Sequence, residues 1–148
     1  KIENKYFERL SKITGKELKI KNIKAYVTLA PRCPYDSEES SFFVTFFANI
    51  PTALSTAGHE IMHFHFHKYY FESVEKQIGH EKTHDLKEAL TVLLNLEFIN
   101  LWFVSDKGYD SHKELRNFIS DEWKKNKNFD KLISSCIDYI KKENEDVK

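Results

Sequence analysis

Cysteine, proline and glycine are all scarce in this chain of 148 residues. It has two cysteines, three prolines and four glycines. The two cysteines, Cys33 and Cys136, are far apart in the sequence, so they form neither the disulfide framework of a small secreted domain nor the paired thiolates of a zinc ribbon. We therefore expect a reducing compartment, the cytoplasm.

An excess of charge of one sign is absent as well. Lys and Arg together number 23, as do Asp and Glu, which gives a formal net charge of zero. No field over the whole molecule would attract it to nucleic acid or to an anionic membrane. The sequence thus predicts neither of these partners, and charge says nothing about the oligomeric state.

Long apolar runs are missing too. The most apolar stretch, residues 89–104, is interrupted by Asn95, Glu97 and Asn100, and a spanning helix needs about 20 apolar residues. We expect a soluble protein. The hydrophobic content of 41% and the aromatic content of 14% are enough to build one core, so residues 1–148 are predicted to form a single domain.

The period of the apolar residues changes from strand-like to helical along the chain. A short helix is predicted over 6–13, with Gly15 at its end, and one or two half-buried strands over 18–29. A polar loop over 31–40 leads to a strand in SFFVTFF, residues 41–47.

Four longer helices are predicted after the last strand. Capping boxes are expected where Ser or Asp precedes Glu by three residues, at Asp85 with Glu88 and at Ser111 with Glu114. The predicted ranges are 51–70, with Pro51 in the first turn, then 85–104, 111–123 and 129–140, followed by a charged, solvated tail. Strands early and helices late indicate an α+β fold.

The motif HEIMH, residues 59–63, carries the chemistry. At about 100° per residue, His59 and His63 lie one above the other on one face of the predicted helix. Two imidazoles in this position can share one tetrahedral ion, and Glu60 is free to act as a base on a metal-activated water.

The stretch TAGHEIMHFHF, residues 56–66, resembles the extended consensus of the zincin metallopeptidases. Glu60 is its only charged residue up to His63, and Phe64 and Phe66 follow, while the polar His65 departs from the consensus. The resemblance covers about a third of the chain. It implies a zincin-like fold, in which a small N-terminal antiparallel or mixed sheet is followed by the active-site helix and a helical C-terminal half.

A catalytic zinc needs a third protein ligand. Zincins with a Met-turn place a glycine and a third histidine at positions that are Phe66 and Tyr69 here, so this branch is disfavoured. His67 would stand about 12 Å from His59 along the helix, and Glu72 would lie on the opposite face.

Glu88 is the preferred third ligand. With Thr91 and Asn95 it forms a single polar stripe on an otherwise apolar predicted helix, and such a stripe needs a polar partner. This arrangement resembles the gluzincins, in which a glutamate downstream of HExxH completes the metal site. They often carry an aspartate four residues after that glutamate, where this chain has Val92, so Thr91 or Asn95 is expected to orient the ligands instead.

Other assignments stay open at this point. Glu88 can simply be a capping-box residue, and the reserve ligands are Glu81, His84, Asp85 and Glu97. His84, Tyr109 and His112 are candidates for stabilising an oxyanion. The strand SFFVTFF can bind an extended substrate at the edge of the cleft or serve as a core strand, and FHFHKYYF, residues 64–71, can line a pocket or fill the core.

We therefore expect a zinc-dependent hydrolase that acts on peptide or protein substrates. His59, His63 and Glu88 would bind Zn²⁺, and Glu60 would be the general base. The alternative is a non-catalytic metal-binding or interaction module built on the histidine-rich helix, and a helical scaffold without metal is a third possibility.

Overall fold

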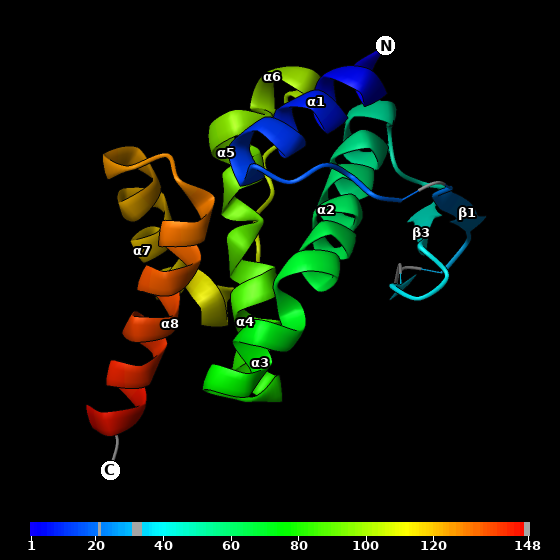
Figure 1. The fold of residues 1–148 in the computed structure, drawn as a ribbon. Helices are drawn as coiled ribbons and strands as arrows, with labels where there is room; N and C mark the ends of the chain where they lie inside the picture. The colour runs from blue at the N-terminus through cyan, green and yellow to red at the C-terminus, as the bar shows by residue number, and fades with distance from the viewer. Residues whose placement is uncertain (21, 31–33, 147–148) are drawn as a thin grey trace.

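The computed structural model describes residues 1–20, 22–30 and 34–146, and its fold is α+β. A small mixed sheet lies beside a larger set of helices (Figure 1). The elements are α1 (Ile2–Thr14), β1 (Lys24–Thr28), β2 (Tyr35–Asp36), β3 (Ser41–Thr45), α2 (Ile50–Tyr69), α3 (Phe71–Ile78), α4 (His80–Leu90), α5 (Val92–Glu97), α6 (Ile99–Trp102), a 3₁₀ turn η1 (Asp110–His112), α7 (Lys113–Lys125) and α8 (Phe129–Asp146).

The three strands are ordered β1-β3-β2. β1 is parallel to β3, in the register Lys24 with Ser41, and β2 is antiparallel to β3, with Tyr35 opposite Phe42. The expectation that SFFVTFF forms the edge of a cleft is therefore wrong, because β3 is the central strand. The residue pattern could not show this, since β2 is a two-residue strand inside the predicted loop.

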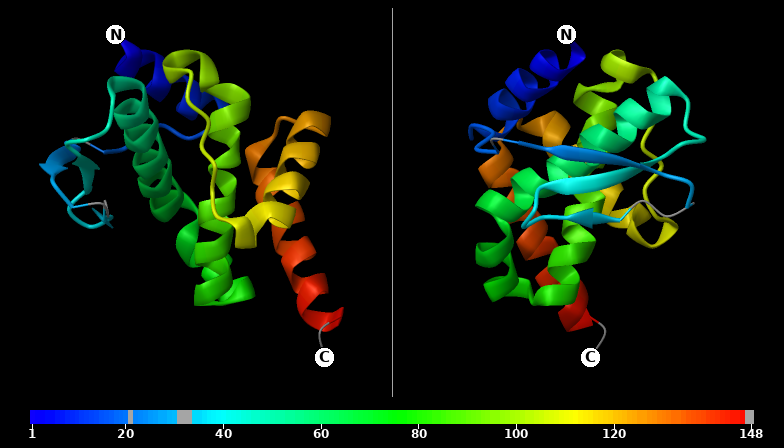
Figure 2. Two further views of the ribbon diagram at one scale, coloured as in Figure 1. Left: turned by 180° about the vertical axis from the view of Figure 1, so that it is seen from behind. Right: turned by 90° about the vertical axis from the view of Figure 1, so that its right-hand side faces the viewer.

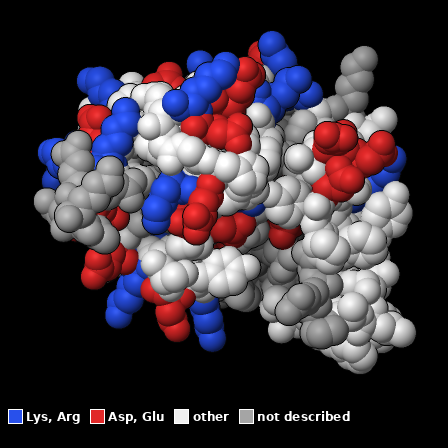
Figure 3. Space-filling view, turned by 90° about the horizontal axis from the view of Figure 1, so that it is seen from below, with Lys and Arg blue, Asp and Glu red and all other residues white. Residues whose placement is uncertain are grey.

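The predicted half-buried strands over 18–29 are only partly correct. A single strand, β1, forms there, and four of its five residues are exposed. The sheet packs on α2 through buried residues of β3 such as Phe42, while β1 and the following turn leave Val27 and Leu29 in solvent. The side of the molecule on which the sheet lies has a largely uncharged area, whereas charges of both signs are mixed over the helices (Figure 3).

Helix α2 begins and ends where the sequence predicts. Asn49 Oδ1 accepts a hydrogen bond from the Thr52 N–H at 2.9 Å and caps the helix, and Pro51 occupies its first turn. The helix lies between the sheet and the remaining helices (Figure 2). This central place buries Phe64, His65 and Phe66, so the aromatic cluster mainly fills the core.

The predicted helix over 85–104 is three shorter ones. α4 already begins at His80, directly after Gly79, so Asp85 and Glu88 lie inside it and form no capping box. Interruptions at Thr91 and Phe98 separate α4, α5 and α6. Their apolar side chains are buried as expected, with Leu90, Leu93, Leu94 and Phe98 in the core.

The last helices close the core on the side away from the sheet. α7 begins after His112 without a side-chain cap, so the predicted capping box at Ser111 and Glu114 is wrong. α8 starts at Phe129 as expected but continues to Asp146, into the segment predicted as a tail. Figures 1 and 2 show the order of layers as sheet, α2, α4 with α5, and then α7 with α8. Within the described residues, every helix is too short or too polar to cross a lipid bilayer.

Candidate metal centre

The two histidines of HEIMH lie together on α2 and face α4. Their ring centroids are 4.3 Å apart. Glu88, near the end of α4, reaches both of them: its Oε2 is 3.4 Å from His59 Nε2, and its Oε1 is 3.2 Å from His63 Nε2. The fold thus brings the three predicted ligands together from two helices. We call His59, His63 and Glu88 the metal group.

The geometry of this group fits a tetrahedral zinc ion. One ligand atom from each of the three residues lies within 4.8 Å of the other two. Two ligands bound at about 2.1 Å to one tetrahedral ion are about 3.4 Å apart, close to the two distances from Glu88. His63 Nδ1 and Nε2 are buried and have no hydrogen-bond partner among the described residues, although Glu88 is so near. A metal ion would satisfy Nε2, and two nitrogens with one carboxylate form a typical zinc donor set.

Asp106 orients His59. Its Oδ2 lies 2.7 Å from His59 Nδ1, which leaves Nε2 as the ligand atom on the side of Glu88. Asp106 lies in the segment between α6 and η1, where no periodic pattern marks it, and it was not predicted. It fills the role expected of an aspartate at the position of Val92, but it comes from a different part of the chain.

Thr91 and Asn95, predicted to support the site, both act through Asp106. Asn95 forms two hydrogen bonds with the Asp106 backbone, accepting from its N–H at 2.7 Å and donating to its carbonyl at 2.8 Å. Thr91 Oγ1 lies 3.1 Å from Asp106 Oδ1. Arg116 of α7, only 6% exposed, pairs with the same carboxylate oxygen at 3.0 Å and donates to Thr91 at 2.8 Å. Thr91 and Asn95 of the polar stripe therefore fix Asp106, and Asp106 in turn orients His59.

Glu60, the predicted base, is buried and lines the same hollow as His59. It is 7% exposed, and its Oε2 has no hydrogen-bond partner among the described residues. Burial raises the pKa of its carboxyl to about 7. It borders a hollow of about 290 Å³, together with His59, Ser55, Thr56 and the segment 104–106. Of the three predicted ligands, His59 lines this hollow, which lies beside the N-terminal half of α2.

Lys87 and Tyr35 form the other wall of the site, and neither was predicted. The Lys87 ammonium is 2% exposed and lies 2.9 Å from Glu88 Oε1. It also donates to the Tyr35 hydroxyl, and it lies 4.5 Å from the centre of the tyrosine ring. The Tyr35 ring is 5.4 Å from that of His63, so the short strand β2 covers the metal group. The sequence contained one signal for this wall: Lys87 is a charged residue next to Glu88 in a predicted helix that is otherwise apolar.

Burial and charge set the protonation of the three ligands. Burial lowers the pKa of His63 to about 3, so that its imidazole is neutral at pH 7. Burial also disfavours the charged form of His59, but hydrogen bonds to Asp106 and Glu88 outweigh it and raise the pKa to about 9. Glu88 is partly buried as well, yet the neighbouring imidazoles and Lys87 hold its pKa well below the usual range. Glu88 is thus ionised and ready to bind a cation.

None of the contacts found among the described residues joins the metal group to His84, Tyr109 or His112, the three candidates for stabilising an oxyanion. His84 packs against His80 and Phe71, and His112 lies 3.1 Å from Asp85. Tyr109 is 62% exposed. The structure assigns none of them to the site.

In the described part of the chain, neither the reserve ligands Glu81 and Asp85 nor the disfavoured His67 and Glu72 belong to the group of His59, His63 and Glu88. Glu81 and Glu72 are exposed, and His67 Nε2 is 3.2 Å from the Tyr35 hydroxyl. Asp85 is bound to His112 and Lys82. Of the acidic residues considered as third ligand, only Glu88 reaches both histidines.

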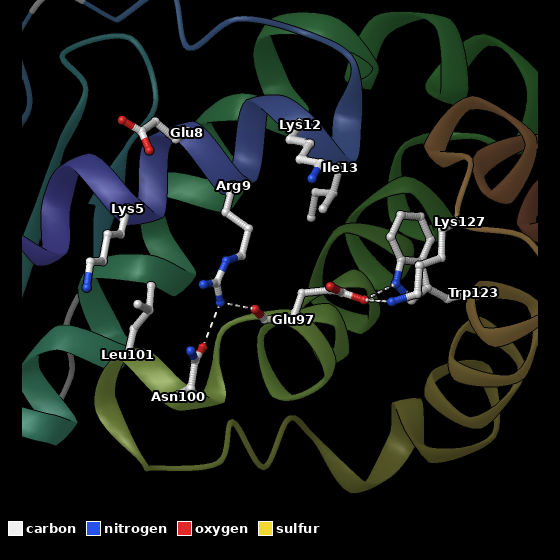
Figure 4. Close-up of a pocket in the computed structure, with 10 residues that line it drawn as sticks. All are labelled: Lys5, Glu8, Arg9, Lys12, Ile13, Glu97, Asn100, Leu101, Trp123 and Lys127. Carbon is white, nitrogen blue, oxygen red and sulfur yellow. Dashed lines mark hydrogen bonds and ion pairs between the residues drawn. The ribbon is translucent and has the colours of Figure 1, made fainter.

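A cavity of about 760 Å³ is separate from the metal group. It lies between α1, the α5–α6 segment and α7 (Figure 4). Glu97 at its wall accepts hydrogen bonds from Trp123 at 2.8 Å and Lys127 at 2.6 Å, and Arg9 binds the Asn100 side chain at 2.7 Å. Glu97 is therefore a structural acceptor here and is not free to bind metal.

Comparison of the chain with protein-family models, with curated proteins and with solved structures found no match. The similarity to zincins therefore rests on the motif and on the local geometry.

Proposed function

We propose that this protein is a zinc-dependent peptide hydrolase of the gluzincin type. The observation that carries the proposal is the convergence of His59, His63 and Glu88 within 4.8 Å, beside a buried Glu60 with an unpaired oxygen. A metal-binding role alone would explain the three ligands. It would not explain a buried carboxylate next to them whose Oε2 has no hydrogen-bond partner among the described residues.

Zinc, Glu60, Asp106 and Lys87 have different roles in the proposed reaction. Zinc, when bound, supplies a Lewis acid that polarises a carbonyl group and makes a water molecule more acidic. Glu60 accepts the proton of the attacking water and delivers it to the departing amine. Asp106 fixes the ring of His59, and Lys87 fixes Glu88, so that both ligands keep their orientation during the reaction. The peptide nature of the substrate is inferred from the resemblance to zincins.

The test is the Glu60→Gln variant. We expect it to retain one tightly bound zinc, because every ligand remains, and to hydrolyse a fluorogenic peptide mixture about 10²- to 10⁴-fold more slowly than the wild type. Zinc content by mass spectrometry and the hydrolysis rate are measured on the same samples, and Glu81→Gln, an exposed glutamate on α4, is the control.

Equal rates for Glu60→Gln and the wild type would exclude Glu60 as the base. Absence of hydrolysis in the wild type, with zinc bound, would instead favour a non-catalytic metal-binding module.

A further inference from the structure

The spacing of the metal motif occurs twice in this chain. Residues 58–63 read GHEIMH, and residues 79–84 read GHEKTH. The second copy opens helix α4, so His80 and His84 are one helical turn apart, as His59 and His63 are on α2. Nothing in the proposed function uses this second pair.

The two pairs share their local geometry. The rings of His80 and His84 have centroids 4.5 Å apart at 63°, compared with 4.3 Å and 77° for the first pair. A carboxylate holds the Nδ1 atom of the leading histidine in each: Glu75 Oε1 lies 2.5 Å from His80 Nδ1, as Asp106 does at 2.7 Å from His59 Nδ1. In both cases Nε2 is left as the atom that can bind a metal.

The surroundings of the second pair are different. The side chain of His80 is 70% exposed, and Lys82 stands where the first motif has Ile61. In the described part of the chain, only the first pair has a third ligand atom within 4.8 Å. Glu81 is exposed and Glu60 is buried. The second pair therefore lacks the features of a hydrolytic centre.

The local charges nevertheless permit a cation. The nearby ammonium groups of Lys76 and Lys82 are paired, with Glu72 at 2.6 Å and with Asp85 at 3.4 Å. Burial and the charge of Lys87 lower the pKa of the His84 imidazole. Imidazole nitrogens select zinc, copper and nickel ions over magnesium and calcium.

We propose that His80 and His84 form a second, weaker site for a divalent transition-metal ion such as Zn²⁺, with Glu75 orienting His80 and water completing the shell. The site shares no ligand with the proposed hydrolytic centre, which is formed by His59, His63 and Glu88. Since Glu75 belongs to α3 and both histidines to α4, the bound ion also restrains the corner at Gly79, where φ is 81°.

The test is a calorimetric titration of the metal-free protein with Zn²⁺ at pH 7.5. We expect two equivalents of different affinity in the wild type. His84→Gln should lose the weaker one and retain the tighter one, and His63→Gln should do the reverse. Glu75→Gln should weaken the second site about 10- to 100-fold without abolishing it, as expected for a residue that orients a ligand. His112→Gln is the control, and Mg²⁺ is the negative probe.

The results separate the two sites. A wild type that binds a single equivalent, or His80→Gln and His84→Gln variants that retain both, would overturn the second site. Loss of the tighter equivalent in His84→Gln would do so as well, because the two sites would not be distinct. If His63→Gln retains both equivalents, the hydrolytic centre fails while the second site stands. His80 is exposed and His84 partly exposed, so both variants should fold, which circular dichroism checks.

Discussion

At the scale of single residues, the metal group depends on side chains that touch its ligands. Asp106 fixes the tautomer of His59, and Lys87 neutralises Glu88 from a position almost out of contact with water. A buried ammonium is costly unless it is paired, so its presence beside Glu88 indicates that this carboxylate must stay charged. Tyr35 provides a second acceptor for the same ammonium.

Replacing Asp106 with Asn should lower the zinc affinity about 10- to 100-fold, because an amide cannot hold the His59 imidazole as a carboxylate does. Competition with a chromophoric chelator measures the affinity of the tighter site. Asp110→Asn, an exposed aspartate in η1, is the matched control. Equal affinities of the two variants would mean that Asp106 does not orient His59.

The affinity for zinc should rise with pH up to about pH 9. Zinc requires the neutral His59 imidazole, whose pKa is about 9 in the metal-free protein, so a proton must leave when the ion binds. Each pH unit below that value should cost up to about tenfold in affinity, whereas His63, with a pKa of about 3, adds no dependence near neutrality. Chelator competition at pH 6.5, 7.5 and 8.5 tests this, and a flat profile would contradict it.

At the scale of helices, close packing and helix breaks place the site. Gly58 lies where α2 meets α6, since a Cβ atom there would be 2.6 Å from the Trp102 ring. Tyr6 of α1 donates to the Gly58 carbonyl at 2.6 Å. The residue before His59 is therefore fixed from two sides. The interruption at Thr91 ends α4 just after Glu88 and frees the Thr91 side chain for Asp106 and Arg116.

The Gly58→Ala variant should be less stable by up to about 2 kcal/mol. The gain in helix propensity is about 1 kcal/mol, but overpacking against a buried indole costs about 1–3 kcal/mol, and the nearby Tyr6 ring prevents an easy shift. Urea denaturation measures the free energy of unfolding. In combination with Trp102→Phe, the loss should be smaller than the sum of the two single losses, and strict additivity would show that the two side chains do not clash.

At the scale of the whole molecule, the metal group links separate layers. His59 and His63 belong to α2, next to the sheet, whereas Glu88 comes from α4 in the layer behind it and Arg116 from α7 in the layer beyond (Figures 1 and 2). Asp106 comes from the segment between α6 and η1. An ion bound here would hold α2 against α4, as a cross-link between residues about 25 positions apart.

Zinc at a free concentration far above the Kd of the site should therefore raise the melting temperature of the metal-free protein. A ligand at about 100 times its Kd adds about 2.7 kcal/mol, which for a chain of this size corresponds to about 5–10 °C. Differential scanning fluorimetry with and without a chelator measures the shift. Glu88→Gln should show little of it, and Glu97→Gln, whose carboxylate lies in the other cavity, should show it in full.

The sequence predicted much of the helical half of the fold. It also predicted that His59, His63 and Glu88 lie together. Periodic apolar residues located α8, because a helix that buries one face repeats that face in its sequence. Pro51, a residue favoured in the first turn of a helix, located α2. His59, Glu60 and His63 were found by their spacing, and Glu88 by its polar stripe. The capping boxes failed because a capping pattern is local, and α4 and α7 begin at other residues, His80 and Lys113.

The sequence by itself determined which atoms could bind a metal, since donor type and helical spacing are properties of neighbouring residues. Only the tertiary structure decided that Asp106 orients His59, that Tyr35 lies against Lys87 and His63, and that β3 is the central strand. These contacts join residues far apart in the chain, and no repeat along the sequence records a contact made by packing. The two HExxH motifs also differ through tertiary packing and not through their own residues. Packing of α4 on α2 places Glu88 beside His59 and His63, whereas His80 of the second pair is exposed.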